Sequence, residues 1–393
     1  MKFEKQVSLK WAIALVLIAC LVSSSIVYYV FAVSPSSAFT ISSGVYPGAP
    51  SYTVWREGSN YFAKDANGEI DYSGTNASYV IQSVINTFTS GGKIFFKQAT
   101  YQLSTALTLK AYTTLEGENW NTIIKSTSNI RAIQMVGTDP NGEYGITIRN
   151  LCIEGTNDSL TGLHLYHTIG FLADHVLIRG HGLYCLYLEN SYNAEFNHVQ
   201  FSQHLEFGGG EYESVGSVEV VINSSNTNTF IGCVFANSKV AAIELTGTSS
   251  KNVFLGGNVE NNYDVGVWIE HGYDNEFNGV WFEAIPIRTL DKHVLIKNAT
   301  LGISNARNTF FDCIFQSDPT GMVNYGIYID KNVGITKILY SQFYSMAIKD
   351  IYIGSSSDFG TTIIGDSFTT MKITDNGVST QIHFCWNGTT WIP

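Results

Sequence analysis

The stretch 228–282 decides the fold, because one short pattern occurs in it three times. It reads NTFIGCVF at 228–235, NVFLGGNV at 252–259 and NEFNGVWF at 275–282, so that two apolar residues stand five positions apart with glycine between them. Side chains of an unbroken strand alternate between its faces, so residues five apart cannot both point into one core. A sharp corner resolves the conflict, and glycine tolerates the left-handed backbone that a corner needs. Each copy is therefore predicted to be a strand end, a corner and a new strand.

The same pattern extends over much of the chain, and its shorter start-to-start gaps are about 23–25 residues. Its third position holds mostly glycine, asparagine or aspartate, with His198 and Tyr340 as exceptions. Such a period is typical of a repeat architecture. The copies begin at Ile148, Leu172, Phe196, Phe230, Phe254, Phe277, Phe310, Ile338 and Ile363, and the predicted corners are Asn150, Asp174, Gly232, Gly256, Gly279, Asp312 and Gly365.

A second pattern, apolar-x-apolar, lies about ten residues upstream of most copies, as at Ile243 and Leu245. Each period therefore holds about three short strands and no segment of helix length. Three strands per turn, stacked turn on turn, define a parallel β-solenoid in which each coil buries its inward residues against the next. Asparagines recur just before the corner pattern, and stacked asparagines can hydrogen-bond along the axis: Asn228, Asn252, Asn275 and Asn308.

Upstream of the coils, several short blocks follow one another in a recognisable order. They are YTVW at 52–55, SYVIQSVIN at 78–86, GGKIFF at 91–96, TY at 100–101 and LEGE at 115–118. This order resembles the entry segment of the pectate-lyase-like superfamily, and the resemblance covers roughly residues 52–380. It implies an all-β fold, a right-handed parallel β-helix with a short N-terminal capping helix. A cap over an open solenoid end needs one apolar helical face, which these residues supply: Val80, Ile81, Val84, Ile85 and Phe88.

Residues 1–33 are predicted to be a targeting or membrane-anchoring segment rather than part of the folded body. Three lysines precede an apolar run over 11–33, which suits a transmembrane helix better than a signal core. This charge pattern predicts a cytoplasmic tip, a membrane anchor and an extracellular body. Two alternatives stay open: cleavage near Ala38, which would secrete the body, and lipidation at Cys20. Asn-x-Ser/Thr sequons agree with an exported body: Asn76, Asn157, Asn223, Asn298 and Asn387.

The rest of the chain divides into four predicted parts. A linker at 34–51 leads to the entry segment at 52–124, which is followed by β-helix coils at 125–380 and a C-terminal cap at 381–393. The exit of an open solenoid exposes core and strand edges, so a cap is expected there as well. Aromatic residues of the last segment are expected to close it: Phe384, Trp386 and Trp391.

Composition excludes two classes of protein. With 45% hydrophobic and 14% charged residues the chain cannot be disordered, because disorder requires more charge and fewer aromatics. The net charge of −11 repels phosphates and excludes nucleic acid as a partner. The cysteines form no CxxC pair, and Cys233 and Cys313 stand in apolar surroundings, which predicts buried free thiols.

Outward residues of the apolar-x-apolar strands are predicted to form columns on one face, because strands of successive coils lie about 4.8 Å apart. Glu219 stacked on Glu244 would place two carboxylates about 5 Å apart, as in a retaining glycosidase. Glu244 and Glu270 would be roughly 8 Å apart, nearer to an inverting enzyme. Glu260 and Glu283 form a further stacked pair. The neighbours predicted to bind sugar rings and hydroxyl groups are Trp268, Tyr187, Tyr328, Glu189 and Asp330.

The better-known active sites of the superfamily do not transfer to this chain. Lyases need an arginine or lysine base, and this face offers only Lys297; polygalacturonases carry Asp-Asp and Arg-x-Lys motifs, which are absent. No metal site and no cofactor is predicted, with calcium as the candidate ion if one bridges an acidic substrate. The loop 204–213 holds metal-capable groups without a standard spacing, and His175 is predicted to be a buried core histidine.

The sequence therefore predicts an extracellular, membrane-anchored β-helix protein that binds polysaccharide or cell-surface glycan along one flank. Cleavage of that glycan by carboxylate-based hydrolysis is the further hypothesis, favoured over β-elimination because carboxylates outnumber bases on the face. The alternative is a non-catalytic surface adhesin or a structural protein of the cell envelope, since outward positions of a solenoid are polar in any case. The membrane is a partner only through residues 11–33.

Overall fold

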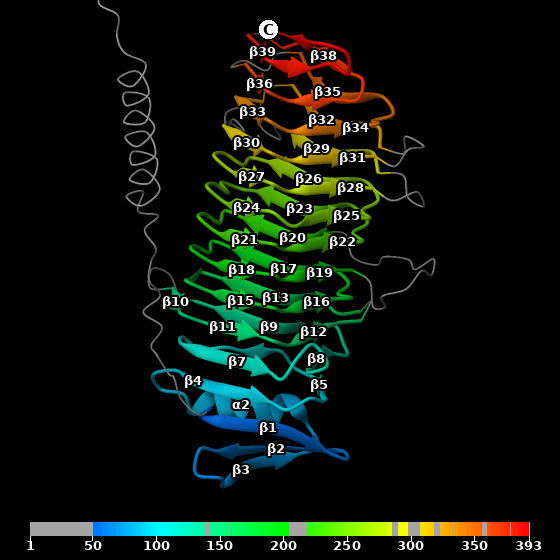
Figure 1. Cartoon of the computed structure of the whole chain (residues 1–393). Helices are drawn as coiled ribbons and strands as arrows, with labels where there is room; N and C mark the ends of the chain where they lie inside the picture. The colour runs from blue at the N-terminus through cyan, green and yellow to red at the C-terminus, as the bar shows by residue number, and fades with distance from the viewer. Residues whose placement is uncertain are drawn as a thin grey trace, which may run out of the picture. The chain divides into compact units, whose positions relative to one another are not determined.

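A computed structural model describes residues 50–137, 142–156, 158–203, 218–284, 290–297, 307–317, 323–331, 333–355, 360–377 and 379–392. In this part of the chain, short strands stack coil upon coil into three long sheets whose neighbours in the coils are parallel (Figure 1). Each coil contributes one strand to each sheet in turn, which is the architecture of a parallel β-helix. The predicted solenoid is confirmed.

The first sheet runs along the stack and begins with an antiparallel meander of its first three strands. Its strands, in spatial order, are β3 (Ile70–Gly74), β2 (Asn60–Asp65), β1 (Tyr52–Glu57), β4 (Gly92–Phe96), β7 (Thr113–Gly117), β11 (Thr147–Arg149), β15 (Leu172–Asp174), β18 (Glu195–Asn197), β21 (Thr229–Ile231), β24 (Val253–Leu255), β27 (Glu276–Asn278), β30 (Asn308–Phe311), β33 (Thr336–Leu339), β36 (Thr362–Ile364) and β39 (Gln381–His383).

The second sheet follows the first across a sharp corner in each coil. Its strands are β5 (Thr100–Leu103), β8 (Ile123–Ser126), β12 (Cys152–Glu154), β16 (Leu177–Arg179), β19 (Gln200–Ser202), β22 (Val234–Ala236), β25 (Asn258–Glu260), β28 (Trp281–Glu283), β31 (Ile314–Gln316), β34 (Gln342–Tyr344), β37 (Ser367–Phe368), β40 (Cys385–Trp386) and β41 (Trp391–Ile392).

The third sheet completes each coil and carries the longest strands of the regular coils. They are β6 (Leu107–Thr108), β9 (Arg131–Val136), β13 (Thr161–Tyr166), β17 (Tyr184–Glu189), β20 (Val218–Asn223), β23 (Ala241–Thr246), β26 (Val265–Glu270), β29 (Lys292–Lys297), β32 (Tyr325–Ile329), β35 (Lys349–Ile353) and β38 (Ile373–Asp375). A separate small pair joins β10 (Glu143–Tyr144) to β14 (Thr168–Ile169).

Columns of phenylalanine fill the interior, as the repeat predicts. Phe230 pairs in register with Phe254, and Phe254 with Phe277. Their ring centroids lie 4.8 and 4.5 Å apart, with interplanar angles of 7° and 2°. All three side chains are almost fully buried. Because dispersion and area burial both increase with such close stacking, this column is a main source of cohesion between coils.

The predicted asparagine ladder is present and buried, and it consists of Asn228, Asn252, Asn275 and Asn308. Asn228 donates from its side chain to Asn252 Oδ1 at 3.0 Å, and Asn252 donates to Asn275 Oδ1 at the same distance. Asn275 continues the series to Asn308 Oδ1 at 3.1 Å. Backbone N–H groups of Asn228, Asn252 and Asn275 donate to the same oxygens, so a side chain such as that of Asn252 satisfies buried polar groups of the preceding coil and of the next.

The corners adopt the expected left-handed backbone, with one error of register. Asn150, Gly232 and Asp312 have φ values of 54°, 58° and 51°. The corner predicted at Asp174 instead falls on His175, at φ 52°, because Ile148 pairs with Ala173 rather than with Leu172. Small Ala173 takes the inward position there, so the large apolar neighbour misled the sequence pattern. His175 is exposed, and its prediction as a core histidine is wrong.

One helix, α2 (Ala77–Thr87), forms in the entry segment and lies at the N-terminal end of the stack (Figure 1). Asn76 caps it by accepting a hydrogen bond from the backbone of Tyr79. The helix buries the expected face, including Val80, Ile81 and Val84, and packs against β2 and β3 of the meander and against β5 and β6, the first strands of the second and third sheets. Its role as a cap stays a prediction.

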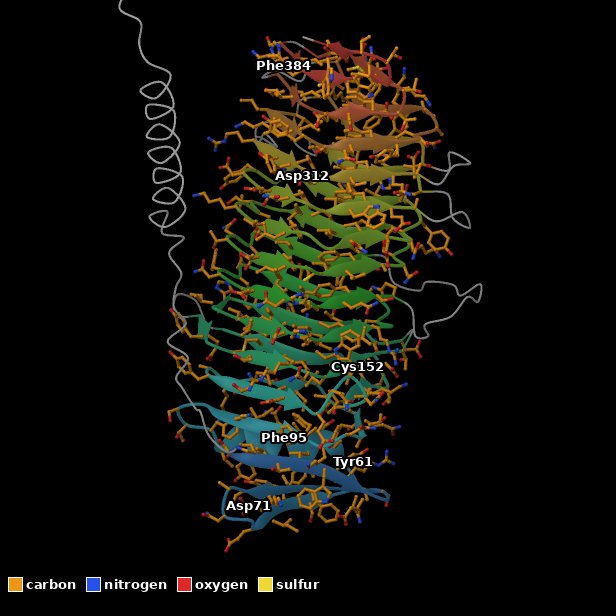
Figure 2. All side chains as sticks on the ribbon, in the orientation of Figure 1. Tyr61, Asp71, Phe95, Cys152, Asp312 and Phe384 are labelled. Atoms are coloured by element: carbon orange, nitrogen blue, oxygen red, sulfur yellow. The ribbon has the colours of Figure 1, made fainter. Side chains whose placement is uncertain are left out.

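The C-terminal end closes in a different way from the one expected. Phe384, which lies at the C-terminal end of the stack (Figure 2), and Trp391 are 67% and 63% exposed, so their rings do not cover the core. Instead β40 pairs antiparallel with β41, Cys385 opposite Ile392, and this hairpin occupies the edge of the second sheet. The outermost strand of this sheet is then β41, which has two residues, and so short an edge strand hinders edge-to-edge association.

Two further expectations concern the N-terminus and the cysteines. The predicted anchor at 11–33 lies outside the described residues. In the part of the chain that the structure describes, no helix has both the length and the apolar character needed to cross a membrane. Among the same residues all cysteines are buried and free, including Cys233 and Cys313, as predicted. Burial raises the pKa of both of these thiols to about 12, so they are inert packing groups.

Candidate functional site

The outer face of the third sheet brings together most of the predicted site residues. In β23, Ile243 and Leu245 point into the core, and Glu244 between them points outward. The register places Glu244 beside Trp268 of the next coil. The same column continues through Leu295, Tyr328 and Tyr352. The predicted column is therefore confirmed from His164 and Tyr187 onward, except that Val221 takes the position predicted for Glu219.

Glu219 does not belong to this face. Val221, not Glu219, pairs with Glu244, and the neighbouring pairs Val218–Ala241 and Val220–Ile243 place Glu219 beside Ala242. Its side chain is fully buried, and its charge helps to raise the pKa of buried Cys185 after burial itself. The predicted stack of Glu219 on Glu244, and with it the retaining pair, is wrong. The apolar run around Glu219 gives no alternation from which its side could be read.

Glu244 and Glu270 remain as the pair of acids on the face. Glu270 follows Trp268 by two residues in β26, so it points to the same side, diagonally from Glu244. Glu244 is half-buried; this burial first, and the charge of Glu270 second, raise its pKa. Glu244 is therefore the carboxyl group of this face whose environment favours the protonated form.

Cationic and phenolic groups border this acid pair. Lys297 pairs in register with Glu270, and its Nζ lies 5.9 Å from the ring centroid of Trp268. Burial, followed by the charge of Glu244, raises the pKa of Tyr184. Tyr184 therefore stays protonated as a hydrogen-bond donor on the Glu244 side of the face.

Stacked rings flank the acids toward the N-terminal coils. Tyr187 stacks on Tyr184 with centroids 5.4 Å apart and on His164 at 5.1 Å. Asn223 Nδ2 donates to the hydroxyl group of Tyr187 at 3.1 Å. Glu189 Oε2 lies 3.4 Å from His164 Nε2. Burial, with a smaller effect of the Arg131 charge, lowers the pKa of His164 to about 4, so this imidazole is neutral near pH 7.

A second aromatic group flanks the acids toward the C-terminal coils. Tyr328 stacks on Tyr352 with centroids 4.5 Å apart and meets Tyr325 edge-on at 5.1 Å. Lys292 Nζ lies 5.4 Å from the centroid of Tyr328. Asp330, one residue beyond β32, accepts a hydrogen bond from the backbone of Lys331 at 2.8 Å. Predicted binding residues thus stand on both sides of Trp268.

Sequence reasoning missed a third outward column and the apolar layer that it builds. Outside the main core, Val218, Val221, Ala241 and Val265 form a second buried cluster. Several half-buried residues pack on it: Tyr184, Tyr187, Val240, Trp268 and Leu295. The missed column contains Ala241 and Val265. Each of them stands three residues before the outward residue of its strand, which is Glu244 or Trp268. Residues three apart do not share a face of a flat strand, so simple alternation along the strand does not predict this column.

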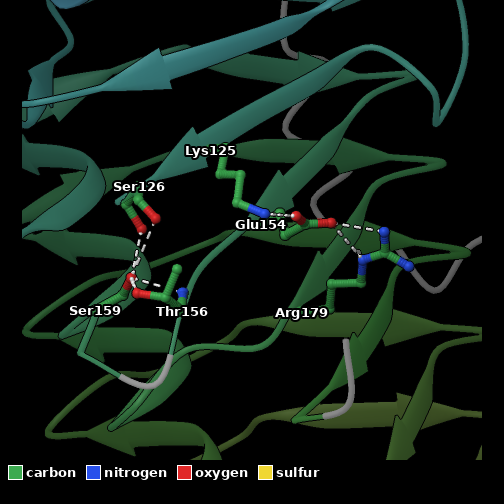
Figure 3. A network of polar contacts seen from close by, with 6 residues as sticks. All are labelled: Lys125, Ser126, Glu154, Thr156, Ser159 and Arg179. Carbon is green, nitrogen blue, oxygen red and sulfur yellow. Dashed lines mark hydrogen bonds and ion pairs between the residues drawn. The ribbon is translucent and has the colours of Figure 1, made fainter. Parts of the chain in front are cut away.

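The second sheet carries two further clusters of charged residues, the Glu260–Glu283 pair and the ion cluster around Glu154, and their environments differ. Glu260 and Glu283 pair in register as predicted, and burial and then the Glu283 charge raise the pKa of Glu260. Glu154 lies between Lys125 and Arg179 of the adjacent coils and accepts from Arg179 Nη2 at 2.6 Å (Figure 3). Burial alone would raise the pKa of Glu154, but the hydrogen bonds from Lys125 and Arg179 outweigh burial and lower it. Glu154 is a satisfied structural ion and offers no free chemistry.

With this geometry established, the chain can be compared with known proteins. No protein-family model matches it, and no curated protein matches its sequence. Solved structures match over most of it. The A-module of mannuronan C-5 epimerase AlgE4 from Azotobacter vinelandii superposes with a TM-score of 0.57 at 11% identity, covering 78% of this chain and 95% of the module.

Two viral proteins are similar in structure to this chain, and each match covers the same share of it as the epimerase module does. The tailspike of Acinetobacter phage vB_ApiP_P1 has a TM-score of 0.53 at 14% identity, over 78% of this chain and 58% of the tailspike. ORF18 of Geobacillus virus E2 has a TM-score of 0.51 at 19% identity, over 78% of this chain and 55% of that protein. The chain thus spans just over half the length of either viral protein. These similarities show the fold alone: a right-handed parallel β-helix.

Proposed function

We propose that the outer face of the third sheet binds a polysaccharide chain along the axis of the coils. One observation carries the proposal: half-buried Glu244 stands in register beside Trp268, and Glu270 stands diagonally from it on the same face. Aromatic rings offer flat apolar platforms to sugar rings, and carboxylates accept hydrogen bonds from sugar hydroxyl groups. Repetition of such groups from coil to coil, about 4.8 Å apart, suits a ligand that is itself a repeating chain.

The comparisons support a carbohydrate ligand in general terms. The epimerase module with the same fold acts, by its name, on mannuronan, a polysaccharide, and nearly all of that module is matched. Sequence identity of 11% carries no residue of its site to this chain. The particular sugar is therefore to be found by experiment rather than by analogy.

The acid pair supports hydrolysis as the chemical step. Glu244, with its raised pKa, would donate a proton to the glycosidic oxygen as the carbon–oxygen bond breaks. Glu270 would accept a proton from the water that attacks the sugar carbon from the other face. The diagonal arrangement gives a separation of roughly 8 Å, which leaves room for this water and predicts inversion at the anomeric carbon.

The test is a screen of the purified full-length protein on mixed polysaccharides, with reducing ends and unsaturated products measured separately. Glu244→Gln is expected to lower the rate of reducing-end release by about 10²-fold or more, because it removes the general acid. Glu276→Gln is the matched control, since Glu276 lies on the first sheet and contacts Asn278. Equal activity of the two variants would refute the catalytic assignment.

Binding is measured separately from cleavage, on a glycan array and by calorimetry. Trp268→Ala is expected to weaken binding by about tenfold, because the largest ring platform is lost. Binding that requires Trp268, without any released product, would identify the protein as a non-catalytic adhesin or envelope component. Binding unaffected by this change would refute the proposed face altogether.

The location of the body is a separate proposal that rests on the sequence. Residues 11–33 would anchor the protein with its β-helix outside the cell. Protease added to intact cells should then digest the coils and leave a cytoplasmic marker whole. Protection of the coils in intact cells would overturn this orientation.

A further inference from the structure

Two histidines meet at the corner between the first and second sheets. His175 and His198 occupy the same corner position in adjacent coils, and their rings stack with centroids 5.1 Å apart and an interplanar angle of 21°. Asp174, the residue before His175, has its Oδ1 2.8 Å from His175 Nδ1. All three side chains reach solvent, and the face proposed to bind polysaccharide, on the third sheet, uses none of them.

The backbone holds the two corners firmly. The N–H of His175 donates to the carbonyl oxygen of Asn197 at 3.0 Å, and that of His198 to Ile231 at 2.8 Å. Both histidines have a left-handed backbone, with φ near 50°, which is uncommon for a residue with a side chain. The next coils use Gly232 and its successors at this position, so the corner itself does not require histidine.

We propose that Asp174, His175 and His198 bind a first-row divalent transition ion such as Zn²⁺ or Ni²⁺. One ligand atom of each residue lies within 4.8 Å of the other two. Zinc takes nitrogen and carboxylate ligands at about 2.0–2.2 Å, so small rotations of these side chains complete the site. His175 and Asp174 are 56% and 36% exposed, so their side chains have room to rotate on the solvent side.

The ligand set decides the class of ion. Two imidazoles and one carboxylate suit zinc, nickel, copper or cobalt, whereas calcium and magnesium prefer sites made of oxygen atoms alone. Both histidines project from fixed, hydrogen-bonded turns, so little backbone order has to be gained on binding. Positions left open toward solvent would be filled by water, as in sites with three protein ligands.

Gly232 leaves the outer edge of the site open. A Cβ atom at this residue would stand 3.1 and 3.2 Å from His198 Cδ2 and Nε2. With glycine there, the ring edge of His198 has no side chain above it from the corner of the next coil. Trp120 lies on the other side, where its indole N–H donates to the carbonyl oxygen of His175 at 2.7 Å. A bound ion would therefore lie near a fluorescent ring.

The test titrates untagged full-length protein with Zn²⁺ by calorimetry and with Ni²⁺ by fluorescence. One equivalent of Zn²⁺ should bind, and Ni²⁺ should quench the emission of Trp120, so that Trp120→Phe reduces the quenching. His198→Asn should weaken Zn²⁺ binding by at least about tenfold and abolish this quenching. Asparagine suits the corner, because Asn150 already occupies the same position two coils away. The fold should therefore survive the substitution.

His383→Asn is the matched control, since His383 is an exposed histidine at the far end of the first sheet. It should leave both titrations unchanged. Zn²⁺ binding that persists undiminished in a His175→Asn/His198→Asn double variant would place the ion elsewhere and overturn the proposal. Absence of binding by the parent protein at millimolar Zn²⁺ would overturn it as well.

Discussion

Asp366 is a buried acid whose ionisation opposes folding. Burial raises its pKa from 3.8 to about 7, against the hydrogen bonds that it accepts from the backbone of Ser341 and Ile364. A pKa that is higher in the folded state means that folding favours the protonated acid. The stability from this group is therefore complete below about pH 4 and is lost as the pH rises toward 7. Asp350, whose pKa is raised to about 6, acts in the same direction.

Asp366→Asn is expected to stabilise the protein at pH 8 and to change little at pH 4. Asparagine keeps an oxygen for the Ser341 N–H and removes the buried charge, which costs on the order of a few kcal/mol at alkaline pH. Urea unfolding at both pH values measures the difference. The same change in stability at pH 4 and pH 8 would show that packing, not ionisation, controls this site.

The side on which a single polar side chain lies, and whether it is buried, was the feature of the site hardest to predict from the sequence. Glu244 and Trp268 were placed correctly, because apolar neighbours on both sides of each fix which way they point. Glu219 was misplaced, because every other residue of β20 but the last is valine or isoleucine, so no alternation marks its side. His175 was misplaced by one residue, since Leu172 imitates the inward residue that Ala173 really is. Burial of a polar group depends on its neighbours in space, which alternation along one strand does not reveal.

At the scale of one element, the asparagine ladder has a measurable share in stability. Asn252 Oδ1 accepts from Asn228, and Asn252 Nδ2 donates to the carbonyl oxygen of Ser225 and to Asn275. Asn252→Ala removes the acceptor of the Asn228 N–H and the donor to Ser225 O, and each unsatisfied group costs about 1–3 kcal/mol. A loss of about 2 kcal/mol or more is expected in urea unfolding.

The matched control for Asn252 is Asn278→Ala on the outer side of the same sheet. Asn278 is half-buried and donates to Glu276 at 3.2 Å, a contact near solvent that costs little to lose. A similar loss for both variants would mean that the ladder contributes no more than an ordinary surface asparagine. The ladder and the phenylalanine columns could be predicted from the sequence, because residues that are one repeat apart occupy equivalent positions in adjacent coils.

At the scale of the whole stack, each coil contacts mainly its two neighbours, so coils should be removable as units. Val253 pairs with Glu276, so deletion of residues 253–275 takes out one complete coil. Phe230 would then meet Phe277, and Phe235 would meet Phe282. We expect a folded β-helix by circular dichroism with a cooperative thermal transition. Deletion of 253–264 removes about half a coil, shifts every inward residue and should prevent folding.

The same deletion separates the fold from the proposed polysaccharide face. The coil 253–275 contains Trp268 and Glu270, so its removal should abolish glycan binding while the protein remains folded. Lys337 pairs with Thr362, and deletion of residues 337–361 removes a complete coil of similar size that leaves Glu244, Trp268 and Glu270 in place. This second variant should bind glycan nearly as well as the parent. If both deletions abolish binding, the ligand needs the full length of the stack rather than the Glu244–Trp268 face. If neither does, the face is the wrong one, because a folded protein without Trp268 would still hold its ligand.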